Sequence, residues 1–184
     1  MLLVIDANVF MGYFKEYVLG ISNDLTNSTL PIFSRIGEED IVFFDFGGNI
    51  EFEWRNIINN DEWFDVWVAR KLIDGGIQKI KAINCYRLEQ NLSTYNFPRD
   101  SRDKWYIRTA KTIIEHYRND FDCNHLSSFL ITEDLDFYFP YKKSKVSGIE
   151  RINLIKHCKS DLVEFLKNSE SIFVTCVENV YKYY

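Results

Sequence analysis

The chain has 184 residues, of which 46% are hydrophobic, 16% aromatic and 27% charged. This length suits one domain with a sizeable core, and the hydrophobic content excludes a largely disordered chain. The formal charge of −5 at pH 7 excludes a protein that holds nucleic acid by one uniformly basic face, so such a partner would need local clusters of cations.

The chain also lacks the marks of export and membrane insertion. No apolar run reaches the length of a membrane span, and the first residues have neither the basic leader nor the long apolar core of a signal peptide. Cys85, Cys123, Cys158 and Cys176 show no CxxC pair and no dense spacing. We therefore expect free thiols in a cytoplasmic protein that does not contact membranes. Zinc binding through Cys123 and His125 is the weaker alternative, because no second pair has matching spacing.

Short apolar runs, typical of buried parallel strands, alternate with helical patterns along the chain. The expected strands are Leu2 to Ile5, Ile41 to Phe44, Phe129 to Ile131 and Ile172 to Val174, and the expected helices are Ile50 to Asn59, Asp61 to Ile73, Arg102 to Tyr117 and Asp161 to Lys167. The segment from Ile77 to Leu92 fits either a helix or an extra edge strand, and Ser93 to Asp100 is typical of a loop. The alternation predicts crossover units in a single α/β domain over residues 1–184, with a mainly parallel sheet.

Acidic residues follow two of these strands. Asp6 comes directly after the first strand, and Asp134 and Asp136 come after the Phe129 strand. Ligands of parallel α/β sheets bind outside the carboxyl ends of the strands, so these carboxylates should meet at one edge of the sheet. Glu53, one turn past a Gly-Gly pair, and Asp103, at the start of the Arg102 helix, can join them from helices.

Such a cluster of carboxylates predicts a site for a hard cation. Several carboxylates cannot stay ionised together without one, and oxygen ligands favour magnesium or manganese. Metal ions lower the pKa of an attacking water and stabilise charge on a phosphate, so phosphodiester hydrolysis needs no covalent nucleophile. The predicted catalytic residues are Asp6, Glu53, Asp103, Asp134 and Asp136, the first four as metal ligands, with Asn8 and Thr132 as supporting hydrogen-bonding groups.

Substrate contacts are expected from cations and aromatic rings near these acids. Basic residues gather between Arg99 and Lys111 and between Lys142 and Lys156. From these clusters and their surroundings we predict Arg102, Lys142, Lys143 and Tyr138 as substrate-binding residues, with Tyr141 as a further ring that could stack on a base.

The tryptophans are better explained by the core. Trp54, Trp63 and Trp67 lie at helical spacing within apolar patterns. An exposed face of Trp63 and Trp67 would instead be an interface for a second copy, giving a homodimer, or for a partner protein.

The order of the acidic motifs resembles the PIN-domain nucleases. The matching segments are Val4-Ile5-Asp6-Ala7-Asn8-Val9, Gly47-Gly48-Asn49-Ile50-Glu51-Phe52-Glu53-Trp54, Asp103-Lys104-Trp105-Tyr106-Ile107-Arg108-Thr109-Ala110, and Thr132 to Phe137. The resemblance implies a three-layer α/β/α fold and a magnesium- or manganese-dependent endonuclease that cuts single-stranded nucleic acid, usually RNA. Many small members are toxins paired with an antitoxin, and others process RNA or act in defence, so an antitoxin or other regulatory protein is an implied partner. The insertion from Gly20 to Asp40 and the tail after Ser169 are not parts of the minimal pattern.

The acids also have structural explanations, and other functions compete. Structure alone would explain Asn8, or Asp100 with Asp103, as helix caps, Glu51 or Glu53 as a solvent-facing helix acid, and Asp134 and Asp136 as turn residues. For Asp6 this explanation is weakest, because a charge that ends a buried strand has to be compensated. A non-catalytic binding or assembly subunit with the same fold is one alternative function. A haloacid-dehalogenase-like phosphatase is another, although that chemistry requires a second Asp where Asn8 stands.

Overall fold

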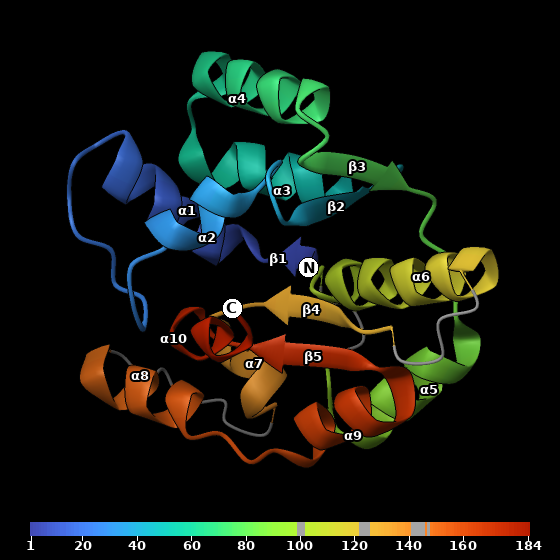
Figure 1. Cartoon of the computed structure of the whole chain (residues 1–184). Coiled ribbons are helices and arrows are strands. Elements are labelled where there is room, and N and C mark those ends of the chain that lie inside the picture. Colours follow the sequence, from blue (N-terminus) through green and yellow to red (C-terminus); the bar gives the residue numbers. More distant parts are fainter. Residues whose placement is uncertain (99–101, 122–125, 141–145, 147) are drawn as a thin grey trace.

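A five-stranded, wholly parallel sheet runs through the middle of the chain (Figure 1). The structure is a computed structural model that describes residues 1–98, 102–121, 126–140, 146 and 148–184. Within these residues the strands are β1 (Leu2–Ile5), β2 (Ile41–Asp45), β3 (Ile77–Ile80), β4 (Ser128–Ile131) and β5 (Ile172–Thr175), in the spatial order β3-β2-β1-β4-β5. The central strand is therefore β1, which pairs with β2 on one side and β4 on the other.

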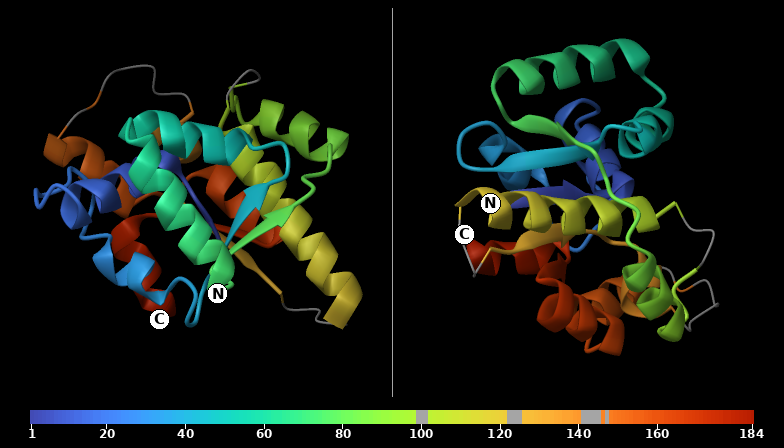
Figure 2. Two further views of the ribbon diagram at one scale, coloured as in Figure 1. Left: turned by 90° about the horizontal axis from the view of Figure 1, so that it is seen from above. Right: turned by 90° about the vertical axis from the view of Figure 1, so that its right-hand side faces the viewer.

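Helices cover both faces of this sheet (Figure 2). The described helices are α1 (Ala7–Tyr17), α2 (Leu30–Arg35), α3 (Asn49–Ile58), α4 (Asp61–Ile73), α5 (Tyr86–Thr94), α6 (Lys104–Phe121), α7 (Leu135–Tyr138), α8 (Gly148–Lys156), α9 (Asp161–Glu170) and α10 (Val177–Val180), followed by a 3₁₀ turn at Tyr181–Tyr183. On one face α1 packs against α3, which also contacts β2 and α4. On the other face α6 packs across β1, β2 and β4, and α9 packs on β5. The predicted three-layer α/β/α fold is confirmed.

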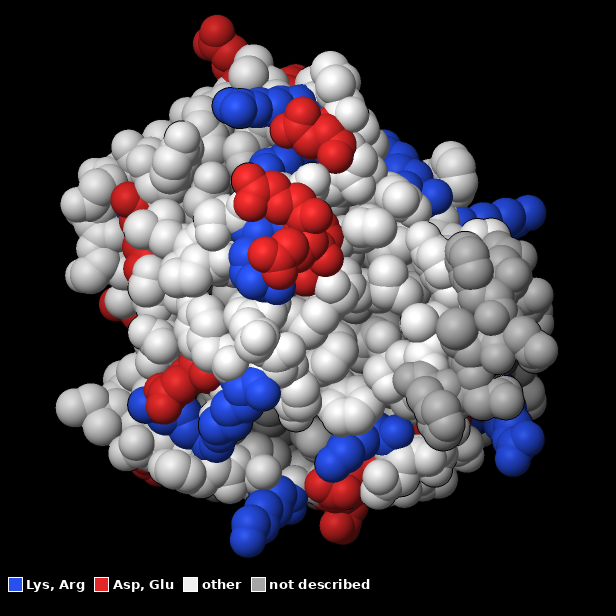
Figure 3. All heavy atoms as spheres, in the orientation of Figure 1, with Lys and Arg blue, Asp and Glu red and all other residues white. Residues whose placement is uncertain are grey.

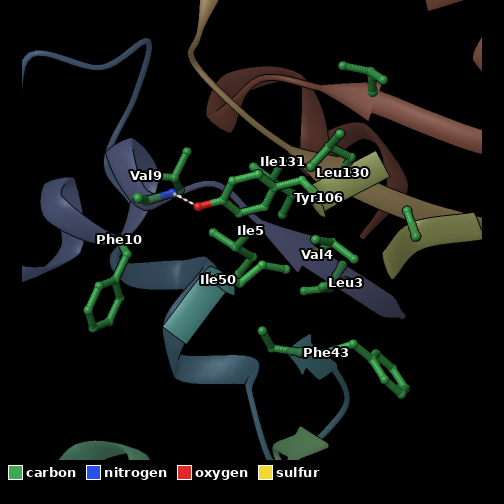
Figure 4. Packing of buried hydrophobic residues seen from close by; sticks show 14 of the residues in the cluster. Leu3, Val4, Ile5, Val9, Phe10, Phe43, Ile50, Tyr106, Leu130 and Ile131 are labelled. Atoms are coloured by element: carbon green, nitrogen blue, oxygen red, sulfur yellow. Dashed lines mark hydrogen bonds between the residues drawn. The ribbon is translucent and has the colours of Figure 1, made fainter. Parts of the chain in front are cut away.

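The core forms around the central strand and the helices beside it (Figure 4). Val4 and Ile5 of β1 are fully buried, as expected for a strand that is covered on both faces. Trp54 of α3 stacks on Phe10 of α1, with ring centroids 4.0 Å apart, and its indole N–H donates to the Ile5 carbonyl at 3.0 Å. Trp67 is also buried and Trp63 packs against the same cluster. The prediction that the tryptophans belong to the core is confirmed.

The expected strands and helices are present within a few residues of their predicted ends, but the structure also contains α1, α2, α7, α8 and α10, which were not among the expected elements. The segment from Ile77 to Leu92 contains both alternatives in succession, since β3 forms the sheet edge and α5 begins at Tyr86. The side chains of Gln78 and Lys79 in β3 are exposed, so this edge strand lacks the continuous apolar character of the inner strands. The loop predicted from Ser93 begins two residues later, at Tyr95, because α5 continues to Thr94.

The pairing of β1 with β4 brings two polar residues together at the carboxyl edge of the sheet. Ile5 is in register with Ile131, and the Asp6 N–H continues the ladder by donating to the Ile131 carbonyl at 2.9 Å. Thr132, the next residue after β4, donates its N–H to the Thr175 carbonyl at 3.0 Å. Asp6 and Thr132 are therefore neighbours across the two central strands.

Charged groups are mixed over the surface. On the face shown in Figure 3, acidic and basic side chains of the described residues lie in mixed groups rather than in one broad basic area. Within the part of the chain that the structure describes, no helix combines the length and the apolar character that crossing a bilayer requires.

Candidate functional site

Asp6 is a buried carboxylate at the junction of β1 and α1. Its side chain is 2% exposed, and it caps α1 by accepting the Asn8 N–H at 3.4 Å. The other carboxylate oxygen accepts the Thr132 hydroxyl at 2.6 Å. The cap accounts for the start of the helix, but it does not require the carboxylate to be buried, because helix caps are ordinarily formed at the surface.

Thr132 joins the two strand ends through one hydroxyl. While it donates to Asp6, the same oxygen accepts the backbone N–H of Asp134 at 3.0 Å. Thr132 is fully buried, so both hydrogen bonds are shielded from water. The Thr132 side chain thus holds the Asp6 carboxylate next to the loop that carries Asp134.

The Asp134 loop has the geometry of an acidic turn. Asp134 caps the short helix α7, and its carboxylate accepts the Asp136 N–H at 2.9 Å. Both side chains are half-buried. Burial, and then the negative charge of Asp134, raise the pKa of the Asp136 carboxyl.

The two acids of α3 have different surroundings. Glu51 forms an ion pair with Lys79 at 2.5 Å, on the side of the helix that faces β3. Glu53 instead accepts the hydroxyl of Tyr106 at 2.9 Å. Of the two competing residues, Glu53 is therefore the one that lies with the other acids.

Asp103 completes the set from the residue before α6. Its backbone carbonyl accepts the N–H of Tyr106 at 3.1 Å in the first turn of the helix, and its side chain is half-buried. The neighbouring Arg102 is exposed. The predicted metal ligands thus come from four places in the fold: the end of β1, α3, the start of α6 and the loop after β4.

The electrostatics of Asp6 show that these carboxylates act on one another. Burial raises the pKa of the Asp6 carboxyl from its ordinary value of 3.8 to about 7. The hydrogen bond from Thr132 opposes that rise, whereas the charges of Asp134, Asp103 and Glu53 add to it. A cation among them would remove the repulsion.

The four carboxylates nevertheless do not form a closed cage. In the described residues, no group of three acidic, histidine or cysteine side chains stands ready to hold a metal ion. Magnesium is usually bound by one or two carboxylates together with waters and substrate phosphates. The described donor set therefore does not form an all-protein metal site, and solvent and substrate would have to complete the coordination of any cation held by these carboxylates.

A cavity of about 340 Å³ opens beside Asp134. Its walls include Asn8, Asp134, Glu133, Lys15 and Arg151, and residues 23–25 of the predicted insertion form one side. Arg151 donates to the backbone carbonyls of Glu133 at 2.5 Å and Asp24 at 3.0 Å. Lys15 and Arg151 thus line a hollow beside Asp134, where Lys15 forms an ion pair with Asp24 at 3.2 Å.

Glu133, one of the residues that line this cavity, is held in place by hydrogen bonds. It is fully buried, and its Oε1 accepts the Thr26 hydroxyl at 2.5 Å and the Val177 N–H at 3.0 Å. Burial raises the pKa of the Glu133 carboxyl. The insertion and the C-terminal tail, which the minimal PIN pattern lacks, therefore meet on the residue between Thr132 and Asp134.

Of the predicted substrate contacts, one needs correction and others lie outside the described residues. Tyr138 is 3% exposed and its hydroxyl donates to the Thr132 carbonyl at 2.9 Å, so it is a core residue and the prediction that it binds substrate is wrong. An aromatic residue after an acidic turn can pack inward as readily as outward, and periodicity over four residues does not separate the two. Lys142, Lys143 and Tyr141 lie outside the described residues, as do Asp100, Cys123 and His125. The other cysteines, Cys85, Cys158 and Cys176, are free thiols as expected.

Sequence reasoning missed Tyr106 and Lys15, and it placed Arg151 only within the basic cluster between Lys142 and Lys156. Tyr106 belongs to the motif that begins at Asp103, and it follows that residue by three positions, a spacing that places two side chains on the same face of a helix. Its hydroxyl on an otherwise apolar helix face was the available signal that it could reach the acids. No comparable signal marked Lys15, because nothing in the sequence shows that the insertion folds back beside α1.

Comparison with known proteins adds no family. No protein-family model, no curated protein and no solved structure matches the chain. The functional argument therefore depends on the residues of this chain.

Proposed function

We propose that the protein is a magnesium- or manganese-dependent endonuclease that hydrolyses phosphodiester bonds of single-stranded nucleic acid, with RNA as the preferred substrate. The observation that carries the proposal is the burial of Asp6 within the field of three further carboxylates. A fold retains such a group at a cost in stability, and strongly perturbed carboxyl groups are typical of functional sites.

Each acid has a role in this proposal. Asp6, Glu53, Asp103 and Asp134 would hold the ion, and Asp136 would assist beside Asp134. A bound ion would supply a Lewis acid that activates water and stabilises negative charge on the phosphate. The chain itself contributes the orientation of the carboxylates, through the Thr132 and Tyr106 hydroxyls, and a site at the sheet edge that admits a polymer.

The surroundings favour a single strand over a duplex. Lys15 and Arg151 line the cavity beside Asp134, and Arg102 is exposed next to Asp103. These are local cations on a chain of net charge −5, whereas a protein that grips a duplex backbone uses many phosphate contacts. A toxin or defence role belongs to the proposal only through the resemblance to PIN-domain nucleases.

The test is cleavage of end-labelled single-stranded RNA and DNA by the purified chain with manganese, magnesium or chelator. Asp6→Asn and Asp134→Asn should both abolish metal-dependent cutting while circular dichroism shows folded protein. Glu38→Gln is the matched control, because Glu38 is an exposed acid on the loop before β2 and its loss should leave cutting unchanged.

Two outcomes would count against the proposal. Cutting that survives in chelator, or in both variants, would come from another site or a contaminant. A folded wild-type chain that cuts neither polymer with either metal would favour the non-catalytic binding subunit, and fluorescence anisotropy with the same RNA would then measure its binding.

A further inference from the structure

One buried hydroxyl lies between two of the predicted metal ligands. Tyr106 of α6 is 0% exposed. Its hydroxyl donates to Oε2 of Glu53 at 2.9 Å and accepts the N–H of Ala7, the residue after Asp6, at 3.2 Å. Figure 4 shows the ring passing between Ile5 and Ile131 to reach the start of α1. A single oxygen atom therefore contacts a carboxylate of α3 and the backbone beside the carboxylate of β1.

The direction of these two hydrogen bonds is determined by chemistry. The Ala7 N–H can only donate, so the tyrosine oxygen accepts from it and gives its one proton to Glu53. This hydrogen bond to Oε2 constrains the orientation of the Glu53 carboxylate.

Thr132 has the same pattern at the Asp6 carboxylate itself. Its hydroxyl donates to the Asp6 carboxylate and accepts the backbone N–H of Asp134. Each hydroxyl thus donates to one predicted ligand and accepts an N–H at or next to another. Together they connect Glu53, the Asp6 junction and Asp134 through buried hydrogen bonds, which are stronger and more directional than exposed ones.

We infer that Tyr106 is a positioning residue of the metal site, which orients Glu53 relative to Asp6 without contacting metal or substrate itself. The inference rests on the proposed metal-dependent function. Hydrogen-bond partners that orient metal ligands typically change metal affinity or activity by about 10- to 100-fold when they are lost. Tyr106→Phe retains the ring and its packing and removes only the hydroxyl, so it isolates this contribution.

The experiment is calorimetric titration of Mn²⁺ into the wild-type chain, Tyr106→Phe, Glu53→Gln and the double variant, with RNA cleavage measured in parallel. Tyr106→Phe should weaken Mn²⁺ binding by about 10-fold or more. The same change in the Glu53→Gln background should have little effect, because residues that act through one another are not additive. Tyr181→Phe is the matched control, since it removes a hydroxyl that donates to the Ser28 carbonyl at 2.6 Å, away from the acids.

Comparing the wild type, the two single variants and the double variant distinguishes a positioning role of Tyr106 from a purely structural one. If Tyr106→Phe binds Mn²⁺ like the wild type, or weakens it equally in both backgrounds, the inference is overturned while the proposed function stands. A purely structural residue would lower the melting temperature in the manner of Tyr181→Phe and leave Mn²⁺ affinity unchanged. A wild-type chain that neither binds Mn²⁺ nor cuts RNA would overturn the inference and the proposed function together.

Discussion

Replacing Asp6 with Asn should stabilise the metal-free protein at alkaline pH. Asn preserves the size of the side chain, and its one oxygen can accept the Thr132 hydroxyl at the position now 2.6 Å away. The Asn8 N–H, now 3.4 Å from the other carboxylate oxygen, then loses its acceptor, which costs about 1 kcal/mol of helix capping. The substitution also removes a negative charge that this site disfavours. Burial and the neighbouring acids raise the pKa of the Asp6 carboxyl from 3.8 to about 7. The wild-type chain therefore carries a destabilising ionised group whenever the pH is above that pKa and no cation is bound.

The sign and size follow from linkage. The unfolded chain releases this proton near pH 3.8, whereas the folded protein retains it to about pH 7. The contribution of Asp6 to the free energy of unfolding is therefore fully present below pH 3.8 and is lost as the pH rises through about 7. The difference between the two pKa values corresponds to about 4 kcal/mol, or a melting temperature lower by about 10 °C for a chain of this size.

The assay is urea denaturation of the wild type and Asp6→Asn in chelator at two pH values. With the lost cap subtracted, the variant should be more stable by about 3 kcal/mol at about pH 8 and about equal to the wild type at about pH 4.5. Adding Mn²⁺ at the higher pH should raise the stability of the wild type, because a ligand that binds only the folded state stabilises it. The variant should gain much less.

The reasoning would be refuted by a gain that is the same at both pH values, or by a variant that is less stable than the wild type in chelator at the higher pH. Glu38→Gln, an exposed acid away from the site, should show no such pH dependence. An equal response of Asp6→Asn and wild type to Mn²⁺ would place the cation elsewhere.

Two further predictions concern the Thr132 hydroxyl and the close contact between Gly76 and Gly37. Thr132→Val replaces the hydroxyl with a methyl group and leaves the Asp134 N–H unpaired. We expect the free energy of unfolding, measured by urea denaturation, to fall by about 1–3 kcal/mol, and Mn²⁺ binding to weaken. Unchanged Mn²⁺ affinity would contradict the role of Thr132 in the site. Gly76→Ala would bring a Cβ within 2.7 Å of the backbone nitrogen of Gly37, and we expect a loss of about 1–3 kcal/mol from the forced backbone shift; wild-type stability would show that the two loops can separate freely.

Much of the fold could be predicted because the inner strands are buried on both faces. The run at Leu2–Ile5 is apolar throughout, and this pattern identifies a central strand of a parallel sheet. The edge strand β3 could not be assigned in the same way, since Gln78 and Lys79 are exposed and its short apolar spacing suits a helix as well. Edge strands carry less of the burial signal on which such predictions depend.

The candidate site was predictable to the extent that it follows strand ends. Asp6 and Asp134 are next to apolar runs, and the pairing of β1 with β4 then places them at one edge. Tyr138 was assigned wrongly because a ring beside an acidic turn has no periodicity that reveals its direction, and its hydroxyl lies in the core. The metal and the substrate remain predictions.

The sequence by itself determined the α/β alternation and the acids at the strand ends, because both depend on residues that are close along the chain. Only the tertiary structure decided that Tyr106 reaches Glu53 and Ala7, and that the insertion and the tail meet on Glu133. These contacts join residues between 44 and 107 positions apart. A local pattern carries no information about which side chains a folded chain brings together over such separations, because packing of the whole core sets that choice.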